Sequence, residues 1–309
     1  MESIQAPLSI VAISYNRPQE LLELLQSLLP QYPYEDIVRE VIILNNGSTV
    51  DYSAVAAFVN QHPELLIQYH HSDENLGVAK GKTWVLKKAQ APYIMVIDDD
   101  AEFNKPGDFR KIAAILEKPF FKENNTAIVT IGIYYHSTKE RQINAFPHKQ
   151  YEQYKSKPYF LTSYFLGGGS VVRKEAIAAV DYYRHAIMYG MEEYDLGYRL
   201  INAGYTLGYD DDVLVWHKES PLGRVSSNEK HALMWHNKAR IVWIFFPKLY
   251  YYTTNLMWGL RYLLKSKGDI KGWWNNIRKI KKTIAATPRE PIQEKGLQYI
   301  KKVGTRLWY

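Results

Sequence analysis

The sequence predicts an α/β fold built around a doubly wound sheet. Over about the first 130 residues, short apolar runs alternate with helical patterns, and 46% of the 309 residues are hydrophobic. This content suffices to bury a large core and is too high for a disordered chain. Strand–helix alternation is typical of a parallel sheet covered by helices on both faces. Three polar clusters directly follow predicted strands: Tyr15–Arg17, Asn45–Ser48 and Asp98–Asp100. Ligands of such sheets bind at the carboxyl ends of the strands.

Each element is expected from local patterning. A strand is placed where an apolar, β-rich run ends in polar or turn-forming residues, and a helix where apolar residues recur every three or four positions. Pro18 suits the first turn of a helix, because an N–H is not needed there, and the leucines between residues 21 and 29 form the apolar stripe of that helix. The expected strands are residues 8–14, 38–44, 66–70, 92–97, 127–135, 170–172 and 213–216, and the expected helices begin at Pro18 and cover 52–61, 78–89, 174–180 and 192–203.

The chain changes character after Ser226, which predicts a division into residues 1–226 and residues 227–309. Residues 230–265 are aromatic and apolar, but Lys, Arg and Pro interrupt them. No uncharged run reaches the ~18–20 residues that a transmembrane helix needs. The pattern favours amphipathic helices whose Trp and Tyr residues suit a membrane interface. Packing on the core or on a second subunit, as in a homodimer, is the alternative.

The positive charge of the chain is concentrated at its end. Residues 261–309 hold 13 Lys and Arg against three Asp and Glu, whereas the whole chain has a formal net charge of +7. A basic, aromatic region indicates an anionic partner surface. We favour a membrane over nucleic acid, because the aromatic residues accompany long apolar faces. Without a secretory signal pattern at its start, the protein is expected to be cytoplasmic and peripheral at the inner face of the cell membrane.

Three consecutive aspartates, Asp98, Asp99 and Asp100, follow the fourth predicted strand directly. At an effective dielectric constant of ~20, each close carboxylate pair costs roughly a few kcal/mol unless a cation or solvent relieves the repulsion. Mg²⁺ and Mn²⁺ bind one or two carboxylates and leave coordination positions for phosphate oxygens. A solvated acidic loop is the alternative. The position at the carboxyl end of a strand favours metal and phosphate binding.

A second acidic cluster, Glu192, Glu193 and Asp195, opens a predicted helix. Carboxylates at a helix start are usually structural, since they interact favourably with the macrodipole. Asp195 and Arg199 are spaced to pair on one helical face. The run Gly167–Gly169 lets the backbone approach a ligand closely, or it makes a flexible turn. The chain has no cysteine, so thiolate catalysis and Cys-ligated metals are excluded.

Taken in order, several motifs resemble those of family 2 glycosyltransferases of the GT-A fold. The resemblance spans about residues 7–240 and is nearest to bacterial enzymes of polysaccharide and O-antigen assembly, including rhamnosyltransferase-like ones. It implies a Rossmann-like mixed sheet flanked by helices. It also implies inverting transfer of a sugar from a UDP- or dTDP-sugar to a hydroxyl of a glycan or lipid-linked acceptor, with Mg²⁺ or Mn²⁺. The motifs are SYNRP, VIILNNGST, DENLGVAKGK, VIDDDAEF, GGGSVVRKEA, YGMEEYDLGYRL and VWH.

The resemblance implies roles for single residues. Glu193 matches the general base, with Glu192 beside it, and Asp195 remains a competing candidate because helix geometry alone does not decide between them. Asp100 matches the metal ligand of the DxD motif, and His217 matches a contact to the metal or diphosphate. The matching donor-binding positions are Tyr15, Asn16, Arg17, Asn46, Asn75, Gly77, Lys80, Asp98, Asp99, Gly168 and Gly169.

Two departures from the family pattern matter. Asn45 stands where many members carry Asp, which affects how the nucleobase is recognised, and the base is a Glu, one methylene longer than the usual Asp. A sugar-nucleotide pyrophosphorylase is disfavoured, because SYNRP lacks the glycine-rich phosphate loop such enzymes need. A catalytically inactive partner subunit is disfavoured by the complete acidic clusters.

Overall fold

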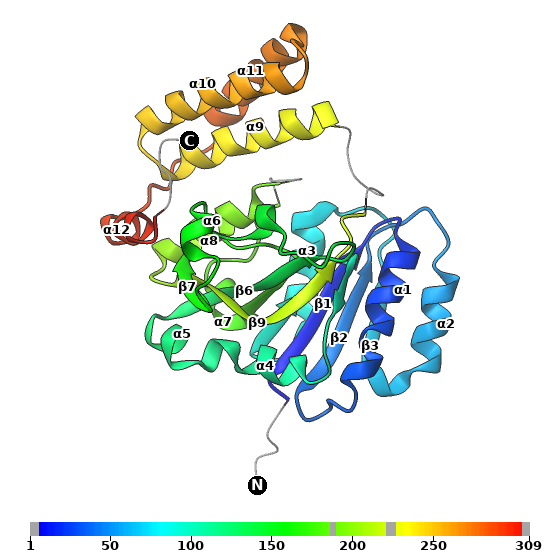
Figure 1. The fold of residues 1–309 in the computed structure, drawn as a ribbon. Coiled ribbons are helices and arrows are strands. Elements are labelled where there is room, and N and C mark those ends of the chain that lie inside the picture. The colour runs from blue at the N-terminus through cyan, green and yellow to red at the C-terminus, as the bar shows by residue number, and fades with distance from the viewer. Residues whose placement is uncertain (1–5, 186–189, 221–226, 305–309) are drawn as a thin grey trace.

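The computed structural model describes residues 6–185, 190–220 and 227–304, which form one mixed sheet with helices on both of its faces (Figure 1). The α-helices are α1 (Pro18–Gln26), α2 (Ser53–Gln61), α3 (Gly77–Lys88), α4 (Asp108–Ala114), α5 (Pro119–Glu123), α6 (Tyr151–Tyr154), α7 (Lys174–Ala179), α8 (Glu192–Asn202), α9 (Ser227–Phe245), α10 (Lys248–Lys265), α11 (Ile270–Ala285) and α12 (Glu294–Lys302). The strands are β1 (Leu8–Ser14), β2 (Val38–Asn45), β3 (Ile67–His71), β4 (Tyr93–Val96), β5 (Ala101–Phe103), β6 (Thr126–Tyr135), β7 (Tyr159–Thr162), β8 (Ser170–Arg173) and β9 (Thr206–His217).

The sheet is parallel in its first half and mixed in its second. Its strand order within the described residues is β3-β2-β1-β4-β8-β6-β9-β5, and β7 also pairs with β9. The strands β1 to β4 are mutually parallel, whereas β8 is antiparallel to both of its neighbours. The crossover helices of the first half therefore bring the ends of β1, β2 and β4 to one edge of the sheet, as expected for a doubly wound arrangement.

The two faces of the sheet bury separate apolar clusters. Because side chains alternate along a strand, Leu8, Ile10 and Ala12 of β1 pack with α1, while Val11 faces the cluster that holds α3. Burial on both faces explains why the strands read as nearly continuous apolar runs. Rigid strands packed on both sides hold the loops at their carboxyl ends in place.

The patterns in the sequence located most of these elements. The first expected strand and β1 have the same bounds, and the first helix begins at Pro18 as predicted. The expected strand at 213–216 is only the end of the longer β9, because its earlier residues pair with β6 and β7. The short strands β5 and β7 were not predicted, since three or four residues carry too little alternation to detect.

The C-terminal helices form a layer above the sheet domain (Figure 1). Helix α9 contacts α8 on one side and α10 and α11 on the other. Trp235, Ile241 and Phe245 of α9 are buried in the same cluster as sheet residues. Helix α9 is therefore buried on more than one side, so the amphipathic helix that the sequence predicts there is not observed. Helix α10 does keep an exposed side. The domain boundary predicted after Ser226 falls outside the described residues.

Within the described residues, no helix has both the length and the apolar character needed to span a membrane. The aromatic stretch at 230–265 instead forms most of α9 and α10, separated at Pro247.

Candidate active site

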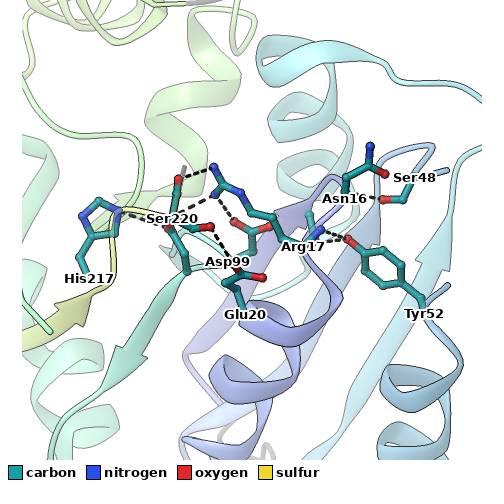
Figure 2. A network of polar contacts seen from close by, with 10 residues as sticks. Asn16, Arg17, Glu20, Ser48, Tyr52, Asp99, His217 and Ser220 are labelled. Atoms are coloured by element: carbon teal, nitrogen blue, oxygen red, sulfur yellow. Dashed lines mark hydrogen bonds and ion pairs between the residues drawn. The ribbon is translucent and has the colours of Figure 1, made fainter. Parts of the chain in front are cut away.

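The carboxyl ends of β1, β4 and β9 meet at one edge of the sheet. Strand β4 leads into the aspartate triplet, and strand β9 ends at His217, which pairs in register with Ala101 directly after the triplet. Arg17 follows β1 and points toward the same place (Figure 2). The chain segments that the sequence predicts to meet therefore do meet.

The triplet is held by a network of ion pairs and hydrogen bonds. Arg17 Nη1 lies 2.9 Å from Asp99 Oδ1 and 3.3 Å from Asp100 Oδ2, and Arg17 Nη2 donates to the Ser220 carbonyl at 3.3 Å. The backbone N–H of Ser220 donates to Asp100 Oδ2 at 2.9 Å. Arg17 thus supplies positive charge between two buried carboxylates (Figure 2), which relieves part of the repulsion that adjacent aspartates create.

The two buried aspartates differ in their proton affinity. Burial raises the pKa of Asp99 to about 7, although Arg17 opposes this rise. Burial also acts to raise the pKa of Asp100, but His217, Arg17 and the Ser220 amide outweigh it and hold that pKa below its usual value. Asp100 is therefore ionised near neutral pH, which is the state required of a metal ligand.

Asp98, Asp100 and His217 form a cluster that fits a divalent cation. Each offers one ligand atom, and these atoms lie within 4.8 Å of one another. His217 Nε2 is 3.2 Å from Asp100 Oδ1, and His217 Nδ1 is 2.8 Å from Gln142 Oε1. An amide oxygen only accepts hydrogen bonds, so Nδ1 donates and Nε2 faces the cluster. Two carboxylates and an imidazole suit Mg²⁺ or Mn²⁺.

A cavity of about 240 Å³ opens beside this cluster. Two glycines of the run Gly167–Gly169 border the cavity, and a side chain at either position would displace a charged side chain of the site. A Cβ on Gly168 would lie 1.8 Å from Asp98 Oδ2, and one on Gly167 would lie 2.3 Å from Lys82 Nζ. The lining includes Lys82, Asp98, Gln142, Asn144, Gly167, Gly168, Glu193 and His217.

The acidic start of α8 borders the cavity through Glu193. Glu193 lines it, and a Cβ on Gly167 would lie 2.5 Å from Glu193 Oε1. Burial raises the pKa of Glu193 above its usual value, and Lys82 opposes this rise. Burial and Glu193 raise the pKa of Glu192 to about 8, and Glu192 Oε2 has no hydrogen-bond partner within the described part of the chain. Glu193 is thus a carboxyl group with raised basicity at the cavity wall.

Asp195, the third acidic residue of this helix, contacts two arginines instead of the cavity. Its Oδ2 accepts from Arg199 Nε at 2.8 Å, and its Oδ1 lies 3.5 Å from Arg184 Nη1. Asp195 is fully buried and does not line the cavity. The pairing with Arg199 follows the i,i+4 spacing in the sequence.

The turn after β2 is organised by asparagines. Asn46 is buried; its Oδ1 accepts from the backbone N–H of Leu76 at 3.1 Å, and its Nδ2 donates to Asn75 Oδ1 at 3.3 Å and to the Gly77 carbonyl at 3.4 Å. Asn46 therefore fixes the loop that begins α3. Asn45 donates to the Tyr69 hydroxyl at 3.0 Å.

The residues after β1 lie near this turn. Asn16 has a positive φ of 56°, which asparagine tolerates better than most residues. Its backbone N–H donates to Ser48 Oγ at 2.9 Å (Figure 2). Tyr15 is half-buried, and Lys80 is on the exposed side of α3. Gly169 has a φ of 142°, and a Cβ there would lie 2.9 Å from Ile133 Cδ1. Gly169 therefore allows the loop conformation but does not line the cavity itself.

Lys82 and Gln142 are site residues that the sequence did not single out. Lys82 is 6% exposed and shares the buried side of α3 with Ala79 and Leu86. This i, i+3, i+7 spacing places a lysine on an apolar face, which is the signal that could have found it. Burial acts to lower the pKa of Lys82, but Asp98, Glu193 and Glu192 outweigh it, so Lys82 remains protonated. Gln142 belongs to a loop with no such signal.

Comparisons with known proteins agree with this geometry. The sequence profile of glycosyl transferase family 2 matches residues 9–180. An uncharacterized protein of Haemophilus influenzae is 27% identical over 175 residues, which cover 55% of this chain and 89% of that protein. The uncharacterized glycosyltransferase YwdF of Bacillus subtilis is 33% identical over 125 residues, 40% of this chain and 43% of YwdF.

Solved structures share the fold at low sequence identity. GalNAc-T7 with UDP, GalNAc and Mn²⁺ matches with a TM-score of 0.63 and 16% identity, covering 90% of this chain and 55% of that chain. S. aureus TarS 1–349 with UDP-GlcNAc matches with a TM-score of 0.62 and 15% identity, covering 88% of this chain and 80% of that chain. The mannosyltransferase PcManGT of Pyrobaculum calidifontis with GDP-Man and Mn²⁺ matches with a TM-score of 0.57 and 16% identity, covering 97% of this chain and 76% of that chain.

The mixed sheet with an acidic edge is the GT-A fold that these glycosyltransferase structures share. The chain belongs to glycosyl transferase family 2. The predicted mixed α/β fold is confirmed. Asp100 and His217, the predicted metal ligands, lie with Asp98 in a cluster that could hold a divalent cation, and the GalNAc-T7 and PcManGT structures contain Mn²⁺. The roles assigned to single residues stay predictions.

Proposed function

We propose that this protein is an inverting glycosyltransferase that moves a sugar from a nucleoside-diphosphate sugar to a hydroxyl of a glycan or lipid-linked acceptor in cell-surface polysaccharide synthesis. One observation carries the proposal: Glu193, Lys82 and the cluster containing Asp98 and His217 line a single cavity. A basic carboxylate and an anion-binding wall are the two features that displacement of a diphosphate requires.

The bond changes follow from these groups. The acceptor oxygen attacks the anomeric carbon from one face, its proton passes to a Glu193 carboxylate oxygen, and the carbon–oxygen bond to the diphosphate breaks on the other face. A divalent cation held by Asp98, Asp100 and His217 would stabilise the negative charge of the diphosphate. Protonated Lys82 adds a further positive charge at the cavity wall. Attack opposite the leaving group inverts the anomeric configuration.

Helix α10 supports attachment of the enzyme to a membrane surface. Five of its exposed large hydrophobic residues lie three or four positions apart, so they form one stripe along the helix. Leu256 is 65% exposed and Leu264 is 82% exposed. The cations Arg261, Lys265 and Lys271 are exposed on α10 and at the start of α11. Apolar side chains beside cations fit an anionic bilayer, and we therefore place the enzyme at the inner face of the cell membrane. The stripe is Leu249, Tyr252, Leu256, Leu260 and Leu264.

Replacing the proposed base tests the catalytic assignment. We expect Glu193→Gln to lower transfer, and the release of nucleoside diphosphate by transfer to water, by about 10²-fold or more, since general base catalysis contributes ~10²–10⁴-fold. Binding of a UDP- or dTDP-sugar, measured by calorimetry with Mn²⁺, should persist. The rate of the wild type should fall as pH decreases through the pKa of Glu193, which lies above its usual value.

The matched control is Glu175→Gln, which removes an exposed carboxylate from α7. It should leave the rate unchanged. Full activity in Glu193→Gln would remove this residue from the proposed role. Absence of donor hydrolysis by the wild type, across UDP-, dTDP- and GDP-sugars with Mn²⁺, would instead indicate a binding protein.

A further inference from the structure

Gln142 joins the proposed cation cluster to the segment that follows β9. Its side chain is only 4% exposed and lines the cavity of the proposed active site. Its Oε1 lies 2.8 Å from His217 Nδ1, and its Nε2 donates a hydrogen bond to Glu219 Oε1, also at 2.8 Å. The amide of Gln142 therefore bridges the last residue of β9 and a carboxylate two positions beyond it.

The contact with Glu219 fixes the direction of this amide. An ionised carboxylate only accepts hydrogen bonds, so the NH₂ group of Gln142 must face Glu219 and its oxygen must face His217. Because that oxygen accepts, the hydrogen of the neutral imidazole is held on Nδ1 and the lone pair on Nε2. Nε2 lies 3.2 Å from Asp100 Oδ1, inside the acidic cluster. Two hydrogen bonds in series thus set which nitrogen of His217 is available to a cation.

The backbone holds both ends of the bridge. The N–H of Gln142 donates to the Ile133 carbonyl of β6 at 2.9 Å. The residues on either side of Glu219 donate their backbone N–H groups to Asp100, one to its carbonyl and one to its Oδ2, each at 2.9 Å. The carboxylate at one end and the amide at the other are therefore attached to fixed segments, so the imidazole between them and the cluster is oriented in advance.

We propose that Gln142, oriented by Glu219, is a positioning residue that presents Nε2 of His217 to the divalent cation. The inference rests on the proposed cation site and concerns a residue that acts through His217. Hydrogen bonds that orient a metal-bound histidine from outside typically contribute about 10–100-fold to metal affinity. An imidazole nitrogen suits first-row transition ions better than Mg²⁺, which prefers oxygen ligands. Loss of the bridge should therefore weaken Mn²⁺ binding more than Mg²⁺ binding.

The test measures the affinity of the full chain for each metal alone, without nucleotide. Paramagnetic resonance of free Mn²⁺ gives the Mn²⁺ affinity, and competition gives that of Mg²⁺. We expect Gln142→Met to weaken Mn²⁺ binding about 10–100-fold and Mg²⁺ binding less. Gln142→Glu combined with Glu219→Gln should stay within about threefold of the wild type, because the new carboxylate accepts from both Nδ1 and the new amide.

The matched control is Gln31→Met. Gln31 is also buried, and its Nε2 donates to the Lys105 carbonyl at 2.6 Å, but it does not line the cavity. This variant loses a buried hydrogen bond of a glutamine without touching the cation cluster, so both metal affinities should equal those of the wild type.

A measurement on the wild type avoids dependence on the folding of a variant. In the metal-free chain with labelled histidine, correlations between ring hydrogens and ring nitrogens should place the hydrogen of neutral His217 on Nδ1. A hydrogen on Nε2 of the neutral ring, an unchanged Mn²⁺ affinity in Gln142→Met, or equal losses of Mn²⁺ and Mg²⁺ affinity overturns the proposal. A wild type that binds no Mn²⁺ overturns the cation site as well, whereas a wild type that binds Mn²⁺ as tightly as Gln142→Met refutes only the role of Gln142.

Discussion

At the scale of single residues, the site depends on close approach between backbone and charged side chains. Gly168 touches Asp98 so closely that any side chain there would occupy the position of the carboxylate. Arg17 and His217 hold Asp100 from two sides. These contacts bring four separate segments of the chain together at the acidic cluster.

We expect Gly168→Ala to impair catalysis more than folding. The added Cβ would lie 1.8 Å from Asp98 Oδ2, so Asp98 must move away from the metal cluster. Mn²⁺-dependent donor hydrolysis should fall at least about tenfold, because misplaced catalytic groups lose rate steeply. The thermal midpoint should change little.

Gly81→Ala serves as the control for this substitution. Its Cβ would meet its nearest atoms at 3.4 Å, and alanine is favoured over glycine within a helix. If Gly168→Ala hydrolysed the donor at the wild-type rate, the present position of Asp98 would not be needed for catalysis.

At the scale of elements, α9 links the sheet domain to the C-terminal helices. It contacts α8, α10 and α11, and α11 and α12 return Ile280, Ile284 and Ile300 to the cluster beneath. Deleting residues 261–309 would therefore release a basic surface and also uncover the core. Point substitutions on the exposed stripe of α10 separate these two effects.

We expect the combined substitution of Leu256, Leu260 and Leu264 by Gln to weaken attachment to vesicles of anionic lipid. Each leucine is largely exposed, so the fold loses little. Burial of each such side chain in a bilayer contributes ~1.5–3 kcal/mol. The measurement is flotation with vesicles of increasing anionic lipid content at several salt concentrations.

The control Leu29→Gln replaces a leucine that is 39% exposed outside the C-terminal helices. It should float like the wild type. Equal flotation of the triple variant and the wild type would exclude the α10 stripe as the attachment surface. If neither protein floated with the vesicles, the proposed attachment to a membrane would be wrong.

At the scale of the whole molecule, charge and ligand binding are linked to stability. The acidic edge of the sheet lies at the ends of β1, β4 and β9, so a ligand bound there stabilises the folded chain only. A ligand at 100 times its Kd adds ~2.7 kcal/mol to the free energy of unfolding. Thermal unfolding therefore reports on metal and nucleotide together.

We expect UDP or dTDP with Mn²⁺ to raise the Tm by several degrees, and EDTA to remove that increase. In Asp100→Asn the increase should be much smaller, because the variant lacks a charged ligand of the cluster. Asp36→Asn, which breaks an exposed ion pair with Arg110, is the control and should respond like the wild type. A nucleotide shift that EDTA leaves unchanged would contradict a metal-dependent site.

Local patterning was sufficient for the sheet and much of the acidic edge. Apolar, β-rich runs that end in turn or polar residues located β1 and β4, and the Asp98–Asp100 motif located the acidic cluster. Such signals are local because strand burial and turn geometry depend on neighbouring residues. The resemblance favoured Glu193 as the base but left Asp195 as a competing candidate, since both occur in the first turn of one helix.

Tertiary structure alone separated these carboxylates and completed the site. Asp195 pairs with Arg199 and Arg184, whereas Glu193 faces the cavity with Lys82. The packing of segments distant in the chain decides which side of a helix lines a cavity. The same packing brings Gln142 into hydrogen-bond contact with His217. The sequence by itself thus predicted the fold and the family, and it located the acidic motif proposed to bind a metal, because the patterns that indicate each of them are local. Packing over long separations decided which groups share the cavity, because only the folded chain brings them within reach.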